Sequence, residues 1–160
     1  MKSRDRSGEV PRGGGWVVAQ FMLMGVTVAA GVAGPRWPGG AQPLLSGIGA
    51  VLAVLGLLLA VFAARTLGRS LTPFPRPAAA GELIDRGAYG LVRHPVYTGG
   101  ILCFVGFSVW AGPAALALTA ALSVLWALKS RLEEQHLAAR YPGYAAYCGR
   151  VRWRLVPFLY

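Results

Sequence analysis

Acidic charge is scarce in this sequence. The 160 residues contain six aspartates and glutamates against sixteen lysines and arginines, which gives a formal net charge of +10. Hydrophobic residues make up 55% of the chain and charged residues only 14%. This composition leaves no region polar enough for a separate soluble domain, so we expect one membrane-embedded unit. The positive charge then favours a membrane surface or an anionic ligand over nucleic acid, whose binders usually carry basic residues on a soluble domain.

Motifs for metal and nucleotide sites are also missing from the sequence. Cys103 and Cys148 form no CxxC pair, and His94 and His136 form no HExxH motif. We therefore expect neither a structural disulfide nor a metal site. No GxGxxG follows a strand pattern and no GxxxxGK occurs, which excludes a soluble dinucleotide fold and a P-loop. Any chemistry must come from the few ionisable side chains.

Long apolar segments organise the chain. Residues 16–34 and 44–64 each carry no charge and are long enough, at ~1.5 Å per residue, to cross a ~30 Å hydrocarbon core. A third uncharged stretch, 98–128, is interrupted at Ala111-Gly112-Pro113, which predicts a helical hairpin. We expect an all-α polytopic membrane protein in one domain, with a flexible basic arm at 1–14, spans at 16–34, 44–64, 95–110 and 114–130, a cytoplasmic loop at 65–94 and a cytoplasmic tail at 131–160.

The lysines and arginines predict the orientation of these spans. With four helices and both termini in the cytoplasm, every lysine and arginine except Arg36 lies on the cytoplasmic side, as the positive-inside rule requires. All acidic residues and both histidines fall on that side too. A cleaved signal peptide ending near Gly31-Val32-Ala33 is the alternative for the first segment, but the length of the run and the further apolar segments favour a membrane span. We therefore expect any active site at the cytoplasmic face.

A charged pair stands directly before the proline that opens the third apolar run. Proline suits the first position of a helix, so Pro95 is expected to begin one. The free N–H groups at that helix end, together with Arg93 and His94, would form an anion site at the interface. Alternatively, both side chains only anchor the helix end among lipid headgroups. Gly99 and Gly100 would let another helix or a ligand approach closely.

Adjacent glutamates near the end of the fourth predicted helix form the second unusual feature. Carboxylates are unfavourable at a helix C-terminus and beside an anionic leaflet, so a cationic group should compensate. Neighbouring helix positions point in different directions, so one of Glu133 and Glu134 can line a cavity while the other contacts a basic partner. A solvated face balanced by Lys129 and Arg131 is the alternative.

Two polar segments flank these motifs. The prolines at 73, 75 and 77 exclude a helix in the connection before the third span. The tail carries tyrosines at 141, 144 and 147, a spacing that predicts one aromatic stripe on a short amphipathic helix at the membrane surface. An interfacial aromatic belt explains this stripe more simply than a ligand site does.

In this order, the pattern GxYxxxRHPxYxG at 87–99, the hairpin, the glutamate pair and the tyrosine-rich tail resemble the isoprenylcysteine carboxyl methyltransferase family. That family belongs to a wider group that includes phospholipid methyltransferases. The resemblance covers about residues 44–157. It implies an integral membrane enzyme that binds S-adenosylmethionine from the cytosolic side and methylates a lipophilic acceptor reached through the bilayer. The short chain is similar to prokaryotic members, which implies the bacterial inner membrane.

The resemblance also implies a set of site residues. A basic residue one helical turn before the glutamate pair would contact the acceptor; Lys129 holds that position, or Arg131 corresponds to the family arginine. Arg93 is the candidate to orient an acceptor oxygen, and Glu134 or His94 is the candidate base for an amine or thiol acceptor. The cytoplasmic loop at 65–94 would bind the cofactor, whose pocket would be lined by Glu82, Leu83, Ile84, Tyr89, His94, Pro95, Val96, Tyr97 and Glu133.

Several alternatives stay open at the level of sequence. A lysine in place of the family arginine loses bidentate carboxylate recognition, so the acceptor could carry a carboxylate, an amine or a thiol. An NADPH-dependent sterol-type reductase is the rival enzyme, because that superfamily shares RHPxYxG and a similar C-terminal end. Such reductases usually have an acidic residue soon after the glycine, where this chain has Gly100, and lack the glutamate pair. The non-catalytic alternative is a lipid-binding scaffold with a basic cytoplasmic face.

Overall fold

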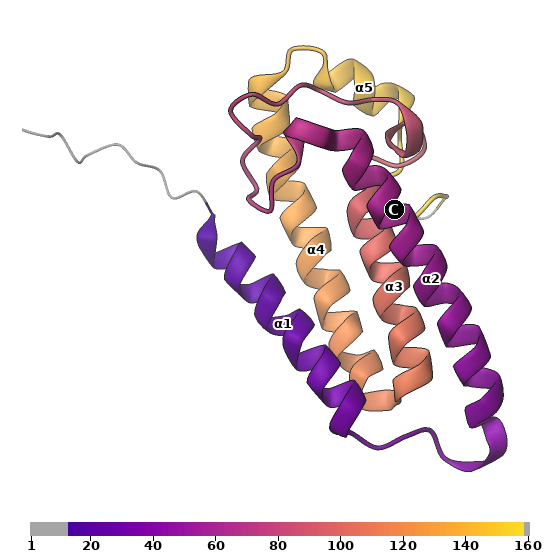
Figure 1. Ribbon diagram of the computed structural model, residues 1–160. Coiled ribbons are helices and arrows are strands. Elements are labelled where there is room, and N and C mark those ends of the chain that lie inside the picture. The colour runs from indigo at the N-terminus through magenta and orange to yellow at the C-terminus, as the bar shows by residue number, and fades with distance from the viewer. Residues whose placement is uncertain (1–12, 159–160) are drawn as a thin grey trace, which may run out of the picture.

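The computed structural model describes residues 13–158. All regular secondary structure in this part of the chain is helical. Four long helices run side by side, while a fifth, short helix and a long loop cover one end of the bundle, here called the loop end (Figure 1). The predicted all-α architecture is confirmed, whereas residues 1–12 of the expected basic arm lie outside the described residues. The helices are α1 (Gly14–Ala33), α2 (Gln42–Leu67), α3 (Pro95–Ala111), α4 (Pro113–Arg140) and α5 (Tyr144–Arg150), with 3-10 turns at Gly39–Ala41, Gly68–Ser70 and Gly87–Gly90.

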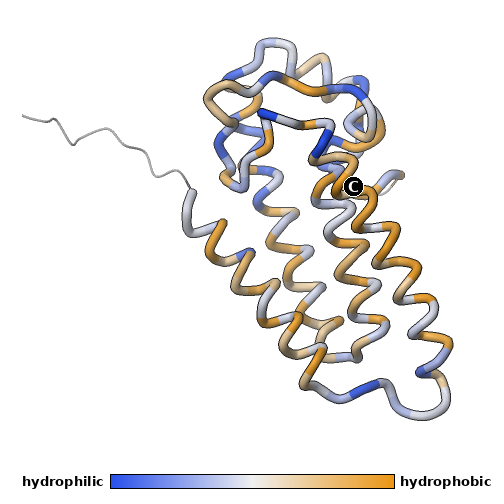
Figure 2. The backbone as a smooth tube through the Cα atoms, in the orientation of Figure 1, coloured by the Kyte–Doolittle hydropathy of each residue, from blue (hydrophilic) through white to orange (hydrophobic). Residues whose placement is uncertain are grey.

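The long helices have the length and polarity of membrane spans. α1, the segment 39–70 around α2, and α4 are each long and apolar enough to cross a membrane, while α3 is a shorter apolar helix. Many large apolar side chains of α1 and α2 are exposed, among them Met22 (64%) and Leu58 (60%). Hydrophobic residues follow the helices, and hydrophilic residues gather at the loop end (Figure 2). The protein is therefore a multi-pass membrane protein.

Glycines bring α2 and α3 into backbone contact. A Cβ placed on Gly56 would meet the backbone of α3, and one placed on Gly99 would meet the backbone of Ala60 in α2. Small residues allow this approach, which strengthens dispersion contacts between membrane helices. Gly99 and Gly100 were expected to allow the close approach of a helix or of a ligand. In the structure both pack against helices: Gly99 contacts the backbone of α2, and Gly100 lies against the ring of Trp126 in α4.

The hairpin and the loop follow from proline and glycine positions. Pro95 and Pro113 each stand in the first turn of their helices, as expected for residues without an N–H to pair. Gly112 joins the two helices with a φ of 145°, which a residue with a side chain rarely adopts. α4 continues past 130 to Arg140, so the glutamate pair lies within one continuous helix. Residues 71–86, which contain the three prolines, form no helix.

Two clusters of buried side chains hold the loop end together. One joins Ala63 of α2 to Ala88 and Tyr89 of the 3-10 turn before RHP. The other joins Tyr144 and Tyr147 of α5 to Val151 in the tail, with Leu83 and Leu137 packed against them. The loop and the tail are thereby fixed over the ends of α3 and α4, where both sequence motifs lie.

Candidate active site

A cavity opens at the loop end between α3, α4, α5 and the proline-rich loop. Its empty volume, counted together with its open mouth, is about 830 Å³. Pro95 is buried in the first turn of α3 and is not part of the wall. The other residues predicted for the cofactor pocket all line it: Glu82, Leu83, Ile84, Tyr89, His94, Val96, Tyr97 and Glu133.

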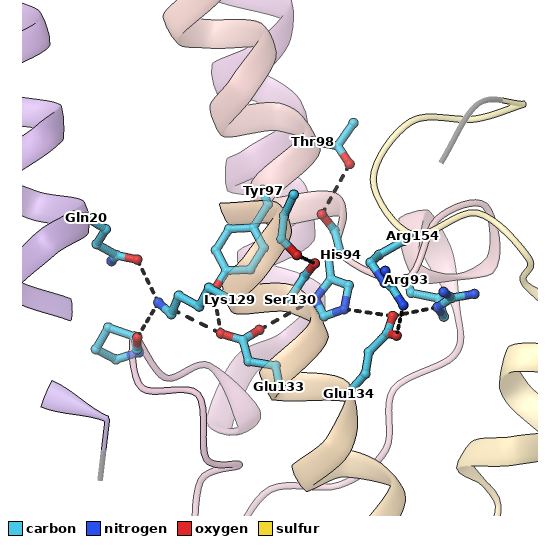
Figure 3. Close-up of polar contacts among 12 residues, drawn as sticks. Gln20, Arg93, His94, Tyr97, Thr98, Lys129, Ser130, Glu133, Glu134 and Arg154 are labelled. Carbon is cyan, nitrogen blue, oxygen red and sulfur yellow. Dashed lines mark hydrogen bonds and ion pairs between the residues drawn. The ribbon is translucent and has the colours of Figure 1, made fainter. Parts of the chain in front are cut away.

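Glu133 reaches from α4 to the cavity wall between groups that can balance its charge. The Tyr97 hydroxyl donates a hydrogen bond to Oε1 over 2.5 Å, and Nδ1 of His94 lies 3.6 Å from Oε2. Nζ of Lys129, one turn earlier on the same helix, lies 3.9 Å from Oε1. Figure 3 shows these groups converging on one carboxylate, whose side chain is 15% exposed.

Glu134 points to a different side of α4 and contacts basic partners. Its Oε1 accepts a hydrogen bond from Nε of Arg93 over 2.7 Å and lies 3.2 Å from Nε2 of His94. Its Oε2 accepts from Nη2 of Arg154 over 2.7 Å (Figure 3). Glu134 lines a separate cleft beside α5 rather than the main cavity. The two carboxylates thus divide between a cavity and a cationic cluster, and His94 lies between them.

The RHP motif binds the protein's own tail. Nη1 of Arg93 donates hydrogen bonds to the carbonyl oxygens of Val151 and Arg152, over 2.9 and 2.8 Å. The backbone N–H groups of Arg93 and His94 donate to the carbonyls of Trp153 and Arg154. These contacts tie the two residues just before α3 to the tail. Arg93 is nevertheless part of the cavity wall, and its Nη2 makes no hydrogen bond within residues 13–158.

Lys129 is fully buried inside the bundle. Its ammonium group donates hydrogen bonds to Oε1 of Gln20 and to the carbonyl oxygen of Pro73, each over 2.6 Å, and lies 5.5 Å from the centre of the Tyr97 ring. Lys129 does not line the cavity, and it touches the site through Glu133. Arg131, the other candidate for the acceptor position, is exposed.

The tyrosines of the tail belong to the cavity, so their assignment to an interfacial aromatic belt was wrong. Tyr144 and Tyr147 are 4% and 2% exposed and line the cavity. Tyr141 follows the end of α4, and its hydroxyl donates to the carbonyl of Gly81 over 2.7 Å. The hydroxyl of Tyr147 donates to the carbonyl of Tyr89 over 2.8 Å. Burial raises the pKa of Tyr144 and of Tyr147, which keeps both phenols neutral.

The sequence analysis missed two contributors to the site. One is Gln20, whose amide is the only side-chain amide in the apolar run 16–34 and is buried against Lys129. A lone amide in a membrane span is a usable signal, because such a group is costly in hydrocarbon unless it is paired. The other lies in the loop that was expected to bind the cofactor: its proline-containing part, within residues 71–77, also lines the cavity, although no residue there was named for the site. Composition alone does not indicate which residues of a loop face a cavity.

A multi-pass helical bundle with a cavity at one end, lined by residues of both motifs, defines the class: a membrane protein with a candidate ligand site. Residues 45–143 match the profile of the phospholipid methyltransferase family. This match covers more than half of the chain, so the protein belongs to that family, whose members transfer methyl groups from S-adenosylmethionine. A search of curated proteins found no match.

Proposed function

We propose that the protein methylates a lipophilic acceptor at the cytoplasmic face of the membrane, with the carboxylate of a prenylcysteine-like molecule as the first acceptor to consider. The observation that carries this proposal is the meeting of two distant motifs: side chains of RHPxY and Glu133 line one cavity at the end of a membrane bundle. Family membership supports methyl transfer over the rival reductase chemistry.

The cavity wall suits S-adenosylmethionine chemically. When bound, this cofactor supplies an electrophilic methyl group on a cationic sulfonium. Carboxylates of Glu82 and Glu133 are available for its amino group or ribose hydroxyls, and the rings of Tyr89 and Tyr97 can face a cation. Three apolar side chains complete a wall for the uncharged part of the ligand: Leu83, Ile84 and Val96.

Transfer to a carboxylate requires positioning and dryness rather than a base, because an ionised carboxylate is already a nucleophile. Nη2 of Arg93 is the nitrogen left to orient an acceptor oxygen, since Nε and Nη1 hold Glu134 and the tail. The buried rings of Tyr144 and Tyr147 cover the site and keep water from it. Lys129 acts as a positioning residue by fixing Glu133, and Glu134 does the same for Arg93.

A phospholipid amine is the second candidate acceptor, favoured by the family that the chain matches. An ammonium acceptor must lose a proton before it attacks. His94 lines the cavity and lies 3.2 Å from Glu134, so the imidazole could take that proton with the carboxylate beside it. A thiol acceptor would make the same demand on His94.

The first experiment supplies both acceptor classes to the purified protein in lipid, with methyl-labelled S-adenosylmethionine. Label in a farnesylcysteine analogue that mild alkali releases identifies a carboxyl methyl ester and supports the first proposal. Alkali-stable label in phosphatidylethanolamine selects the amine. If the protein binds S-adenosylhomocysteine but transfers label to neither acceptor, the proposed cofactor site is supported and both acceptors are rejected. No binding of S-adenosylhomocysteine, with binding of NADPH, would overturn the methyltransferase proposal.

A further inference from the structure

Arg76 is a cation in the cavity wall for which residues 13–158 supply no partner. The residue is half-buried and lines the cavity. Within residues 13–158 no hydrogen bond, ion pair or ring contact engages its guanidinium. Arg93, the other arginine of the wall, differs because Glu134 and two tail carbonyls hold it. No group in the described part of the chain compensates this partly buried charge, so an anionic group of a ligand in the cavity would be favoured beside it.

Hydrogen bonds anchor the loop on both sides of Arg76. Pro75 and Pro77 flank the arginine, so the backbone on both sides has a restricted φ. The loop around them is tied to the bundle by side chains: Lys129 holds the Pro73 carbonyl, Arg140 holds the Ala79 carbonyl and Tyr141 holds the Gly81 carbonyl. At the end of the loop, Ser70 Oγ accepts from the Glu82 N–H over 2.9 Å. Such anchoring lowers the entropy cost of presenting one side chain to a ligand.

The charges on the cavity wall complement those of the proposed cofactor. S-adenosylmethionine carries two cationic groups, its sulfonium and its amino group, and one carboxylate. Glu82 and Glu133 supply negative charge to the wall, and Glu134 and two tail carbonyls engage Nε and Nη1 of Arg93. Arg93 keeps only Nη2 for a ligand, whereas the whole guanidinium of Arg76 is available and can bind a carboxylate with two parallel hydrogen bonds.

We propose that Arg76 binds the carboxylate at the amino-acid end of the cofactor. This inference rests on the proposed function, because it assumes that S-adenosylmethionine occupies the cavity. The inference goes beyond the proposed function because it assigns a residue outside both sequence motifs to one functional group of the ligand. Arg76 is then a binding residue, and its contribution appears in affinity for any ligand that carries this carboxylate.

The test compares two ligands that differ at the relevant end of the molecule. S-adenosylhomocysteine has the amino-acid carboxylate, and 5′-methylthioadenosine lacks the whole amino-acid moiety. Calorimetry on the full-length protein in detergent gives the affinity of wild type and Arg76→Gln for each. We expect Arg76→Gln to lower the affinity for S-adenosylhomocysteine by about tenfold or more, because a charge-assisted hydrogen bond is lost. Affinity for 5′-methylthioadenosine should be unchanged.

Two further variants complete the design. Arg69→Gln removes an arginine that is exposed and lies outside the cavity wall, so it should bind both ligands as wild type does. Arg76→Lys keeps the charge but loses the bidentate geometry, and its affinity should fall between wild type and Arg76→Gln. Equal affinity of wild type and Arg76→Gln for S-adenosylhomocysteine would overturn the inference while the proposed function stands. A wild type that binds neither ligand would remove the proposed function itself.

Discussion

Gln20 and Lys129 are 109 positions apart in the sequence, and their side chains form a hydrogen bond of 2.6 Å inside the bundle. Lys129 is 0% exposed and Gln20 is 7% exposed. The pair joins α1 to α4 directly beneath the cavity, since Lys129 also contacts Glu133 and holds the Pro73 carbonyl (Figure 3). A buried ammonium group is expensive without partners. The amide of α1 is therefore part of what makes a cation tolerable at this position.

Replacing Gln20 with leucine should destabilise the bundle. The change removes an acceptor from a buried ammonium, which costs about 1–3 kcal/mol of unfolding free energy. Gln20→Glu keeps an acceptor oxygen for Lys129 and serves as the matched control. Thermal unfolding in detergent measures both variants. If Gln20→Leu unfolds at the wild-type temperature, the hydrogen bond contributes no stability and Lys129 must be satisfied by its other contacts.

Glutamine substitutions should separate the roles of the two adjacent glutamates. Glu134 pairs with two arginines: Arg93, which binds a tail carbonyl, and Arg154, which is itself part of the tail. Glu134→Gln should therefore loosen residues 151–155. Trypsin cleavage after Arg150 and Arg152 reports this loosening, and we expect it to accelerate severalfold. Glu133→Gln should leave the cleavage rate unchanged.

The same pair should show the opposite order in ligand binding. Glu133 lines the cavity and Glu134 does not, so Glu133→Gln should lower the affinity for S-adenosylhomocysteine by about tenfold. Glu134→Gln should act on binding only through the tail, with a smaller effect. Equal effects of the two variants in both assays would mean that the carboxylates work as one unit, contrary to the division described above.

How far the sequence predicts this site depends on the kind of residue. Pro95 begins α3 because a local rule places proline at a helix start, and the neighbouring site residues follow from the motif. Tyr144 and Tyr147 were misassigned because three-residue spacing describes a helix face without saying what that face contacts. The role of Arg93 in holding Val151 and Arg152 depends on how the tail folds back, which no local pattern encodes.

Contact between α2 and α3 should depend on Gly56. A Cβ at this position meets the backbone of α3, which cannot move aside as a side chain can, so Gly56→Ala should destabilise the protein by about 1–3 kcal/mol. Gly47 lies on the same helix in open space, and Gly47→Ala should be neutral or stabilise by up to ~1 kcal/mol through helix propensity. Thermal unfolding of the two variants gives the comparison. Equal stability would show that the two helices separate at little cost.

The buried tyrosines of the loop end should make stability fall at alkaline pH. Burial raises the pKa of Tyr89, of Tyr144 and of Tyr147, whereas in the unfolded chain each titrates near ~10. Above that pH the unfolded chain binds fewer protons than the folded one, so the free energy of unfolding decreases as the pH rises through ~10 toward the folded values. Below it, these groups give no pH dependence.

Two measurements check this expectation. Ultraviolet absorbance of tyrosinate, followed against pH, should show a late-titrating group of tyrosines in the native protein that merges with the rest after denaturation. Tyr147→Phe should reduce the late amplitude and lower the free energy of unfolding by about 1 kcal/mol, because the hydrogen bond to the Tyr89 carbonyl is lost. A native protein whose tyrosines all titrate together near the unfolded value would mean that α5 opens readily and leaves the cavity uncovered.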